Sequence, residues 1–165
     1  MRRALFLSLY AASAFLLPTL ARAQREKLPD DDLEFVQRTW PRAHKLFTCI
    51  RYIVRKHGDG PTPRPGDMVS VLYSGTLLSE YAKNPTKPEP FDKALDPRHP
   101  FTVRVGRGQV IEGWDEILQL MRAGSKYLVI VPSELAYGSR GQPPLIPRDA
   151  TLVFEMEVIK IDREK

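Results

Sequence analysis

The chain has 165 residues with 25 Lys or Arg and 20 Asp or Glu, which gives a formal net charge of +5. This length suits one domain with its own core, and the basic residues are spread among acids, which argues against nucleic acid as a partner. Cys49 is the only cysteine, so an intramolecular disulfide is excluded. The histidines lie at no metal-ligand spacing from one another or from Cys49, and we expect neither a metal ion nor a cofactor.

Residues 1–23 are predicted to be a signal peptide. Two early arginines are followed by an apolar run over residues 4–17 and by a small-residue cleavage site at 21–23, so cleavage falls before Gln24. A membrane anchor is the alternative, but the apolar run is shorter than the roughly 20 residues that a spanning helix needs. We therefore expect a secreted or secretory-pathway protein, with the endoplasmic reticulum lumen or the periplasm as alternatives, and no membrane association after cleavage.

Residues 24–46 are predicted to form an N-terminal helical extension. Three aspartates at 30–32 suit a helix N-cap, and apolar residues follow at helical spacing. Pro41 interrupts this pattern, so the helix breaks or kinks there. The apolar stripe either packs on the main domain or forms a homodimer, and a chaperone or adhesin role around Phe35 and Trp40 is a further alternative.

Residues 47–165 are predicted to form the main domain. Five segments show the period-two pattern and the β-branched residues of strands. They cover residues 49–55, 68–77, 101–105, 126–131 and 151–161.

A single core helix is predicted from Gly113 to Met121, because its apolar residues share one face and Gly124 follows as a terminator. Five prolines between Ser79 and Pro100 predict a long irregular excursion. Five strands and one helix predict an α+β fold, in which an antiparallel five-stranded β-sheet wraps around a short α-helix.

Six sequence blocks then occur in a familiar order. They are Val71-Leu72-Tyr73-Ser74-Gly75, Phe91-Asp92, Pro100 to Val103, Gly106 to Asp115, Leu135-Ala136-Tyr137-Gly138 and Ile146 to Phe154. Together they resemble the FKBP family of peptidyl-prolyl cis/trans isomerases, and the resemblance runs from about Phe47 to Ile161. The signal peptide and N-terminal helix are also similar to those of secreted macrophage infectivity potentiator proteins and of endoplasmic reticulum FKBPs.

The resemblance implies a site for a proline ring. It assigns catalytic roles to Tyr73, Asp92, Tyr137 and Phe154, and substrate or inhibitor binding to Phe91, Phe101, Val103, Val110, Ile111, Trp114, Leu145 and Ile146. Trp114 would form the floor, Leu145 and Ile146 the roof, and the Ile111 backbone N–H a donor to ligand carbonyls. It also implies proline-containing peptides and proteins as substrates and the macrolides tacrolimus and rapamycin as inhibitors. Taken singly, such apolar residues are typical of an ordinary core.

These residue types suit rotation of an X-Pro bond, which breaks no covalent bond and needs no nucleophile. The planar amide is held by resonance with a barrier of roughly 18–20 kcal/mol, and an apolar cup with a few donors favours the twisted form. A binding module with incidental turnover is the alternative. The segment formed by residues 78–90 is longer than the corresponding segment commonly is in the family. Gln142 stands where an aromatic or basic residue is common, and Val103 stands where an aromatic wall residue is common. These replacements predict a more open pocket.

Overall fold

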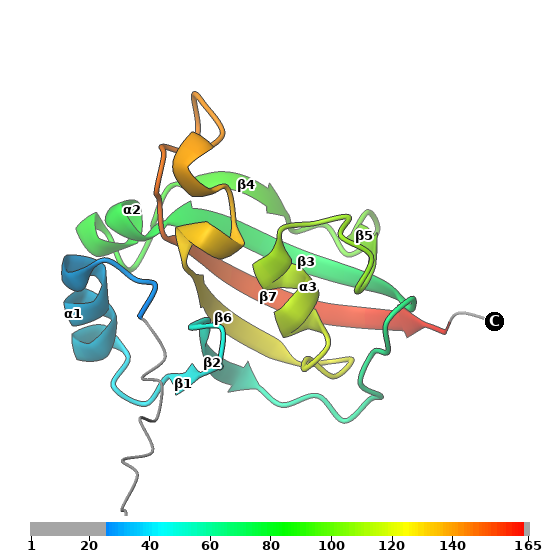
Figure 1. Ribbon diagram of the computed structural model, residues 1–165. Helices are drawn as coiled ribbons and strands as arrows, with labels where there is room; N and C mark the ends of the chain where they lie inside the picture. The colour runs from blue at the N-terminus through cyan, green and yellow to red at the C-terminus, as the bar shows by residue number, and fades with distance from the viewer. Residues whose placement is uncertain (1–25, 164–165) are drawn as a thin grey trace, which may run out of the picture.

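The computed structural model describes residues 26–163, so the signal peptide predicted at residues 1–23 lies outside the described residues. The elements are α1 (Asp30–Thr39), β1 (His44–Lys45), β2 (Arg51–Lys56), β3 (Met68–Leu77), α2 (Leu78–Lys83), β4 (Pro90–Ala94), β5 (Phe101–Arg104), α3 (Glu112–Leu118), β6 (Lys126–Val131), the 3-10 helices η1 (Ser133–Leu135) and η2 (Gly138–Arg140), and β7 (Leu152–Asp162) (Figure 1). Within the described range, no helix has the length and apolar character needed to cross a membrane.

One antiparallel sheet of seven strands forms the body of the molecule, in the order β1-β2-β6-β7-β3-β4, with β5 also paired to β3. The long strands β3 and β7 run side by side over their whole length and set Gly75 opposite Phe154. The outer edge of β3 pairs with β5 through Met68 to Val71 and with β4 through Tyr73 to Thr76. This α+β arrangement confirms the predicted fold class, although the sheet gains β1 and β4 beyond the five predicted strands.

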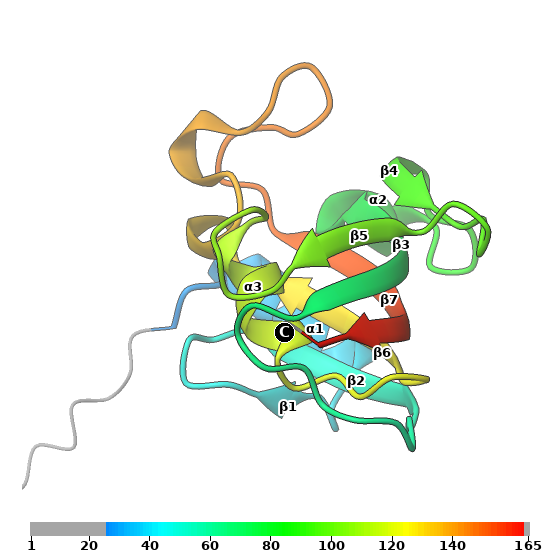
Figure 2. The ribbon, with the colours of Figure 1, turned by 90° about the vertical axis from the view of Figure 1, so that its right-hand side faces the viewer.

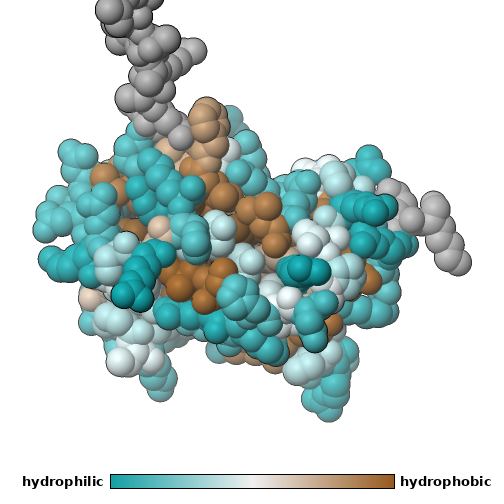
Figure 3. Space-filling model, turned by 90° about the horizontal axis from the view of Figure 1, so that it is seen from below, coloured by the Kyte–Doolittle hydropathy of each residue, from teal (hydrophilic) through white to brown (hydrophobic). Residues whose placement is uncertain are grey.

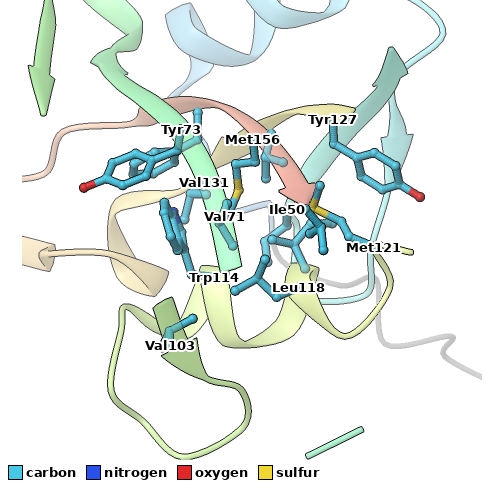
Figure 4. Packing of buried hydrophobic residues seen from close by; sticks show 14 of the residues in the cluster. Ile50, Val71, Tyr73, Val103, Trp114, Leu118, Met121, Tyr127, Val131 and Met156 are labelled. Atoms are coloured by element: carbon cyan, nitrogen blue, oxygen red, sulfur yellow. The ribbon is translucent and has the colours of Figure 1, made fainter. Parts of the chain in front are cut away.

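The helix α3 packs against one face of the sheet and forms the main core with it. Trp114, Ile117 and Leu118 point from α3 toward the sheet, each at most 4% exposed, and the side chains around them interlock closely (Figure 4). Gly113 allows this approach, because a Cβ there would lie 2.5 Å from Val131 Cγ1.

The opposite face of the sheet carries a second core made by the N-terminal extension. Val36 and Trp40 are buried against Leu128, Ile130 and Val153 of the sheet together with α2, and Trp40 lies 5.2 Å from the Tyr81 ring. In Figure 1, α1 and α2 lie together at one end of the sheet. The extension is therefore packed on its own domain, which supports the first of the two predicted roles for its apolar stripe.

A buried ion pair fastens the start of this extension. Glu26 accepts hydrogen bonds from both terminal nitrogens of Arg51, at 2.7 and 3.1 Å, and from Lys45 Nζ at 3.0 Å. Arg51 is only 6% exposed. These bonds, led by the one from Arg51, hold the pKa of the Glu26 carboxyl well below its ordinary value.

Two local predictions need correction, whereas a third is confirmed: the first helix breaks before Pro41 and ends at Thr39. Its N-cap position is Pro29, without a side-chain cap, rather than one of the aspartates. The excursion from residue 79 to 100 contains both α2 and β4, and Pro90 is tolerated there because it is the first residue of an edge strand.

Candidate active site

A cavity of about 220 Å³ opens beside the first turn of α3. Its walls come from five separate elements and two loops: Tyr73, Phe91, Asp92, Phe101, Gln109, Val110, Ile111, Trp114, Tyr137 and Phe154. The wall residues are contributed by β3, β4, β5, α3 and β7, by the turn before α3, and by the segment between η1 and η2. That segment belongs to the β6–β7 connection, which rises well above the sheet (Figure 2).

Aromatic rings surround Trp114 edge to face. The Trp114 centroid lies 4.8 Å from Tyr73, 5.3 Å from Phe154 and 5.8 Å from Phe101, with interplanar angles from 83 to 89°. Trp114 itself is 4% exposed, and its indole nitrogen is buried without a hydrogen-bond partner in residues 26–163. The edge-to-face contacts hold the rings rigidly, so the cavity has a fixed apolar floor.

Gly75 allows the rings of Phe91 and Phe154 to meet across β3. A Cβ at position 75 would lie 2.7 Å from Phe154 Cε1 and 2.9 Å from Phe91 Cζ, closer than carbon atoms pack. The Phe91 and Phe154 rings occupy the space that a side chain would fill, with centroids 5.9 Å apart. The glycine therefore shapes the cavity wall without touching a ligand.

The polar groups gather at one side of the cavity. The Tyr73 hydroxyl donates a hydrogen bond of 2.5 Å to Asp92 Oδ2, and the Lys93 backbone N–H donates to Asp92 Oδ1 at 2.8 Å. Burial, followed by the hydrogen bond to Asp92, raises the pKa of Tyr73, and burial followed by the charge of Asp92 raises that of Tyr137. Both phenols are therefore protonated donors at neutral pH.

Two further donors remain available for a ligand. Two phenols line the cavity. The Tyr73 hydroxyl is engaged by Asp92, whereas the Tyr137 hydroxyl has no hydrogen-bond partner inside the described part of the chain. The second donor is the backbone N–H of Ile111. This residue stands at the N-cap position of α3, where its carbonyl accepts from the backbone N–H of Trp114. Asp115 fixes the preceding turn by accepting from the backbone N–H groups of Gly106 and Gly108, at 2.9 and 2.7 Å.

The structure brings most of the predicted site residues together. Those that line the cavity are Tyr73, Phe91, Asp92, Phe101, Val110, Ile111, Trp114, Tyr137 and Phe154. The sequence reasoning gave no role to Gln109, which also lines it and whose side-chain oxygen accepts from the Arg104 backbone N–H at 2.9 Å. Its place directly before Val110, inside a matched block, was the available signal.

Three predicted binding residues lie outside the cavity lining. Val103 is 2% exposed and packs in the core below Trp114 (Figure 4), because its strand pairing with Val69 turns it inward. Leu145 and Ile146 do not form a roof: hydrogen bonds between the backbones of Gln142 and Ile146 close a tight loop there. The loop leaves Leu145 59% exposed and turns Ile146, at 2%, into the core.

The arrangement offers shape and hydrogen bonding rather than bond-making chemistry. The cavity is bordered by rings, two aliphatic side chains, one amide and one carboxylate, and Cys49 is buried in the turn between β1 and β2. No Ser, Thr, Cys, Lys or His lines the cavity. Such a site suits a compact apolar ring with a nearby carbonyl group.

The family model for "FKBP-type peptidyl-prolyl cis-trans isomerase" matches residues 60–159, and the chain belongs to this family. It is thus a rotamase, an enzyme that acts on X-Pro peptide bonds.

The individual relatives agree with this assignment. The chain is 42% identical over 106 residues to FK506-binding protein 1 of Eremothecium gossypii, covering 64% of this chain and 86% of that protein. It is 46% identical over 100 residues to the peptidyl-prolyl cis-trans isomerase FKBP2 of Mus musculus, covering 61% and 66%. The solved structure of FkpA from Escherichia coli superposes with a TM-score of 0.67 at 30% identity, covering 80% of this chain but only 58% of that one.

Proposed function

We propose that this protein accelerates cis/trans rotation about X-Pro bonds in secreted or secretory-pathway proteins, by stabilising a twisted amide in the cavity without a covalent step. The single observation that carries the proposal is the Trp114-floored cavity, whose rings leave room for one pyrrolidine ring beside a cluster of donors. Residues 1–23 motivate the secretory setting, because their sequence has the pattern of a signal peptide.

The proposed mechanism depends on the difference between planar and twisted amide. The planar amide owes its barrier of roughly 18–20 kcal/mol to resonance, which places partial charges on nitrogen and oxygen. Twisting removes this charge separation, so a desolvated aromatic cavity disfavours the planar form more than the twisted one. The proline ring would sit over Trp114, and lowering the barrier by about 5 kcal/mol gives an acceleration on the order of 10⁴-fold.

The polar groups would hold the peptide while its bond rotates. We assign the Ile111 backbone N–H and the Tyr137 hydroxyl as donors to ligand carbonyls, and Asp92 as the polar group beside the twisting carbonyl. Tyr73 would act by orienting Asp92 through their 2.5 Å hydrogen bond. Positioned donors of this kind lower a barrier because they need no reorganisation during the reaction.

Macrolides are proposed as competitive ligands of the same cavity. Several relatives, among them the protein of Eremothecium gossypii, carry FK506 binding in their names, and the matching residues here line one cavity. We expect tacrolimus and rapamycin to displace a proline peptide, with an affinity that depends on the loop around Gln142, which lacks the aromatic or basic residue common there.

A protease-coupled assay with short X-Pro peptides tests the proposal. Combining Tyr137→Phe with Asp92→Ala is expected to lower kcat/KM by about 10²-fold or more, since loss of positioned polar groups costs on this order. Tyr127→Phe is the matched control, because Tyr127 is a largely buried phenol outside the cavity. Full activity in the double variant would contradict the mechanism, and peptide binding without turnover in the unaltered protein would identify a binding module instead.

A further inference from the structure

One stretch of the chain departs from the general mixing of basic and acidic residues. Between residues 35 and 58 the sequence has six Lys or Arg, two His and no Asp or Glu. The fold places this stretch on the end of α1, on β1 and on β2, with exposed side chains at Arg38, Arg42, Lys45, Arg55 and Lys56. Glu26 and Glu34 reach into it and pair with Arg51, Lys45 and Arg38. The remaining cations give this edge of the molecule a positive potential.

The same edge exposes unpaired strand backbone. β1 has two residues and pairs only with Arg51 and Tyr52 of β2. Within the described residues, no strand covers β2 on that side from Ile53 to Lys56. A strand edge of this kind can accept an extended peptide through main-chain hydrogen bonds.

The short segment from Trp40 to Ala43 lines two grooves next to this strand edge. One, of about 160 Å³, is lined by Trp40, Pro41, Arg42, Ala43 and Ile53. The other, of about 480 Å³, shares Trp40, Pro41 and Ala43 with the first and also includes Lys45. Figure 3, which views the molecule from the side of β1 and β2, shows apolar residues in the middle of this face with hydrophilic residues around them.

We propose that this surface, formed by the β2 edge, the two grooves and the cations Arg42, Arg55 and Lys56, is a docking site for an extended acidic polypeptide segment that carries a large apolar side chain. None of these three cations forms a salt bridge in residues 26–163. Acidic residues of the partner would meet them while the apolar residue enters the groove at Ile53. The positive charge of these three residues is the reason for expecting an acidic partner.

The alternatives fit this surface less well. A second copy of the chain would bring two positively charged edges together, which opposes association. An anionic lipid surface matches the charge, but it is broad and smooth, whereas these grooves are concave, and the one at Ile53, of about 160 Å³, is sized for a single side chain. The exposed strand edge also offers hydrogen bonds that only a polypeptide backbone pairs with in register.

The docking site lies away from the catalytic cavity. Ile53 contacts the core on the α1 side of the sheet, whereas Trp114 and the cavity lie on the α3 side. A substrate protein held at the docking site would present its prolines at a raised local concentration, without any change in the chemistry of the cavity. The inference thus concerns substrate capture and stands apart from turnover of short peptides.

Fluorescence anisotropy with a labelled, proline-free peptide of about 12 residues tests the proposal, with Asp or Glu alternating with Phe or Leu. The expected result is saturable binding that Arg42→Glu combined with Arg55→Glu weakens at least about tenfold. Lys87→Glu combined with Lys160→Glu is the matched control, because it changes the net charge equally at exposed sites on other elements. Turnover of a short X-Pro peptide is expected to stay unchanged in both double variants.

A second variant separates the groove from general charge attraction. Ala43→Phe fills the groove at unchanged charge and is expected to abolish binding, with thermal melting used to verify that the variant is folded. Equal loss of binding in the Lys87/Lys160 control, or undiminished binding in Ala43→Phe, would overturn the proposal. So would binding to vesicles containing phosphatidylserine with no binding to the peptide, since that result identifies a lipid-binding face.

Discussion

Replacing Gly75 with alanine perturbs the cavity walls without removing any ligand contact. The new Cβ would lie 2.7 Å from Phe154 Cε1 and 2.9 Å from Phe91 Cζ. Carbon atoms in contact are separated by about 3.5–4.0 Å, so both rings must retreat by roughly 1 Å. Because Phe154 also packs on Trp114 at 5.3 Å, this movement reaches the cavity floor as well.

We expect kcat/KM for a short X-Pro peptide to fall about 10- to 100-fold, since a displacement of about 1 Å in a site can cost on the order of 10²-fold. Overpacking should lower the free energy of unfolding by about 1–3 kcal/mol. The protease-coupled assay, run well below the melting temperature, separates the two effects.

Gly60→Ala provides the control for overpacking alone. Its Cβ would lie 2.7 Å from Ala123 Cβ, a comparable overlap, but neither residue lines the cavity. This variant is expected to lose stability and keep its kcat/KM. The reasoning is refuted if Gly75→Ala is destabilised yet turns over substrate at the unaltered rate, because the ring positions would then not govern activity.

Three further predictions concern stability. Glu26→Gln should lower the free energy of unfolding by about 2 kcal/mol, because buried Arg51 loses its charged partner. In urea titrations, the difference in stability between the unaltered protein and this variant should shrink as the pH falls below 4.5, because the Glu26 carboxyl of the unfolded chain then takes up a proton. Trp40→Ala should cost about 3–5 kcal/mol without changing short-peptide turnover, whereas Phe47→Ala, at an 84% exposed position, should cost almost nothing; equal melting temperatures would contradict the second core. Stability should fall as the pH rises above 10, because unfolded tyrosines release protons that Tyr73 retains when folded, and Tyr73→Phe should flatten this slope in urea titrations.

Strands with strong local patterns were predictable to the residue. The alternation of β-branched residues gave β3 at Met68–Leu77 and β6 at Lys126–Val131 with the bounds that the structure has. The core face of α3 was equally clear, because Trp114 and Ile117 recur at helical spacing. In each case the spacing of the apolar residues along the sequence shows which face of the element is buried.

Elements whose existence depends on a distant partner were missed. β1 has only two residues and exists because it pairs with β2. β4 starts at a proline in a polar segment, and its pairing with the far half of β3 makes it a strand. The break of α1 before Pro41 was predictable from the proline, but the contact between Trp40 and Tyr81 was not, because no local pattern records a contact between residues so far apart in the sequence.

The site could be predicted only through the resemblance to a family. Taken alone, Trp114 and Phe154 are indistinguishable from core residues, and both are in fact almost fully buried. Their role depends on the register that sets β7 beside β3 and on the glycine that lets the rings meet. Leu145 and Ile146 lie outside the cavity lining for a related reason, since a motif does not record that the loop turns one side chain to solvent and the other into the core.

Exchange NMR on a short X-Pro peptide tests the central claim most directly, because it follows both isomers at equilibrium without a coupled protease. A small molar fraction of the protein should raise the cis/trans exchange rate far above the uncatalysed rate, which is slow on the scale of tens of seconds, and tacrolimus should return it to that value. An exchange rate equal to that of peptide alone, measured with folded protein that still binds the peptide, would contradict the claim that this aromatic cavity eases rotation about the proline bond.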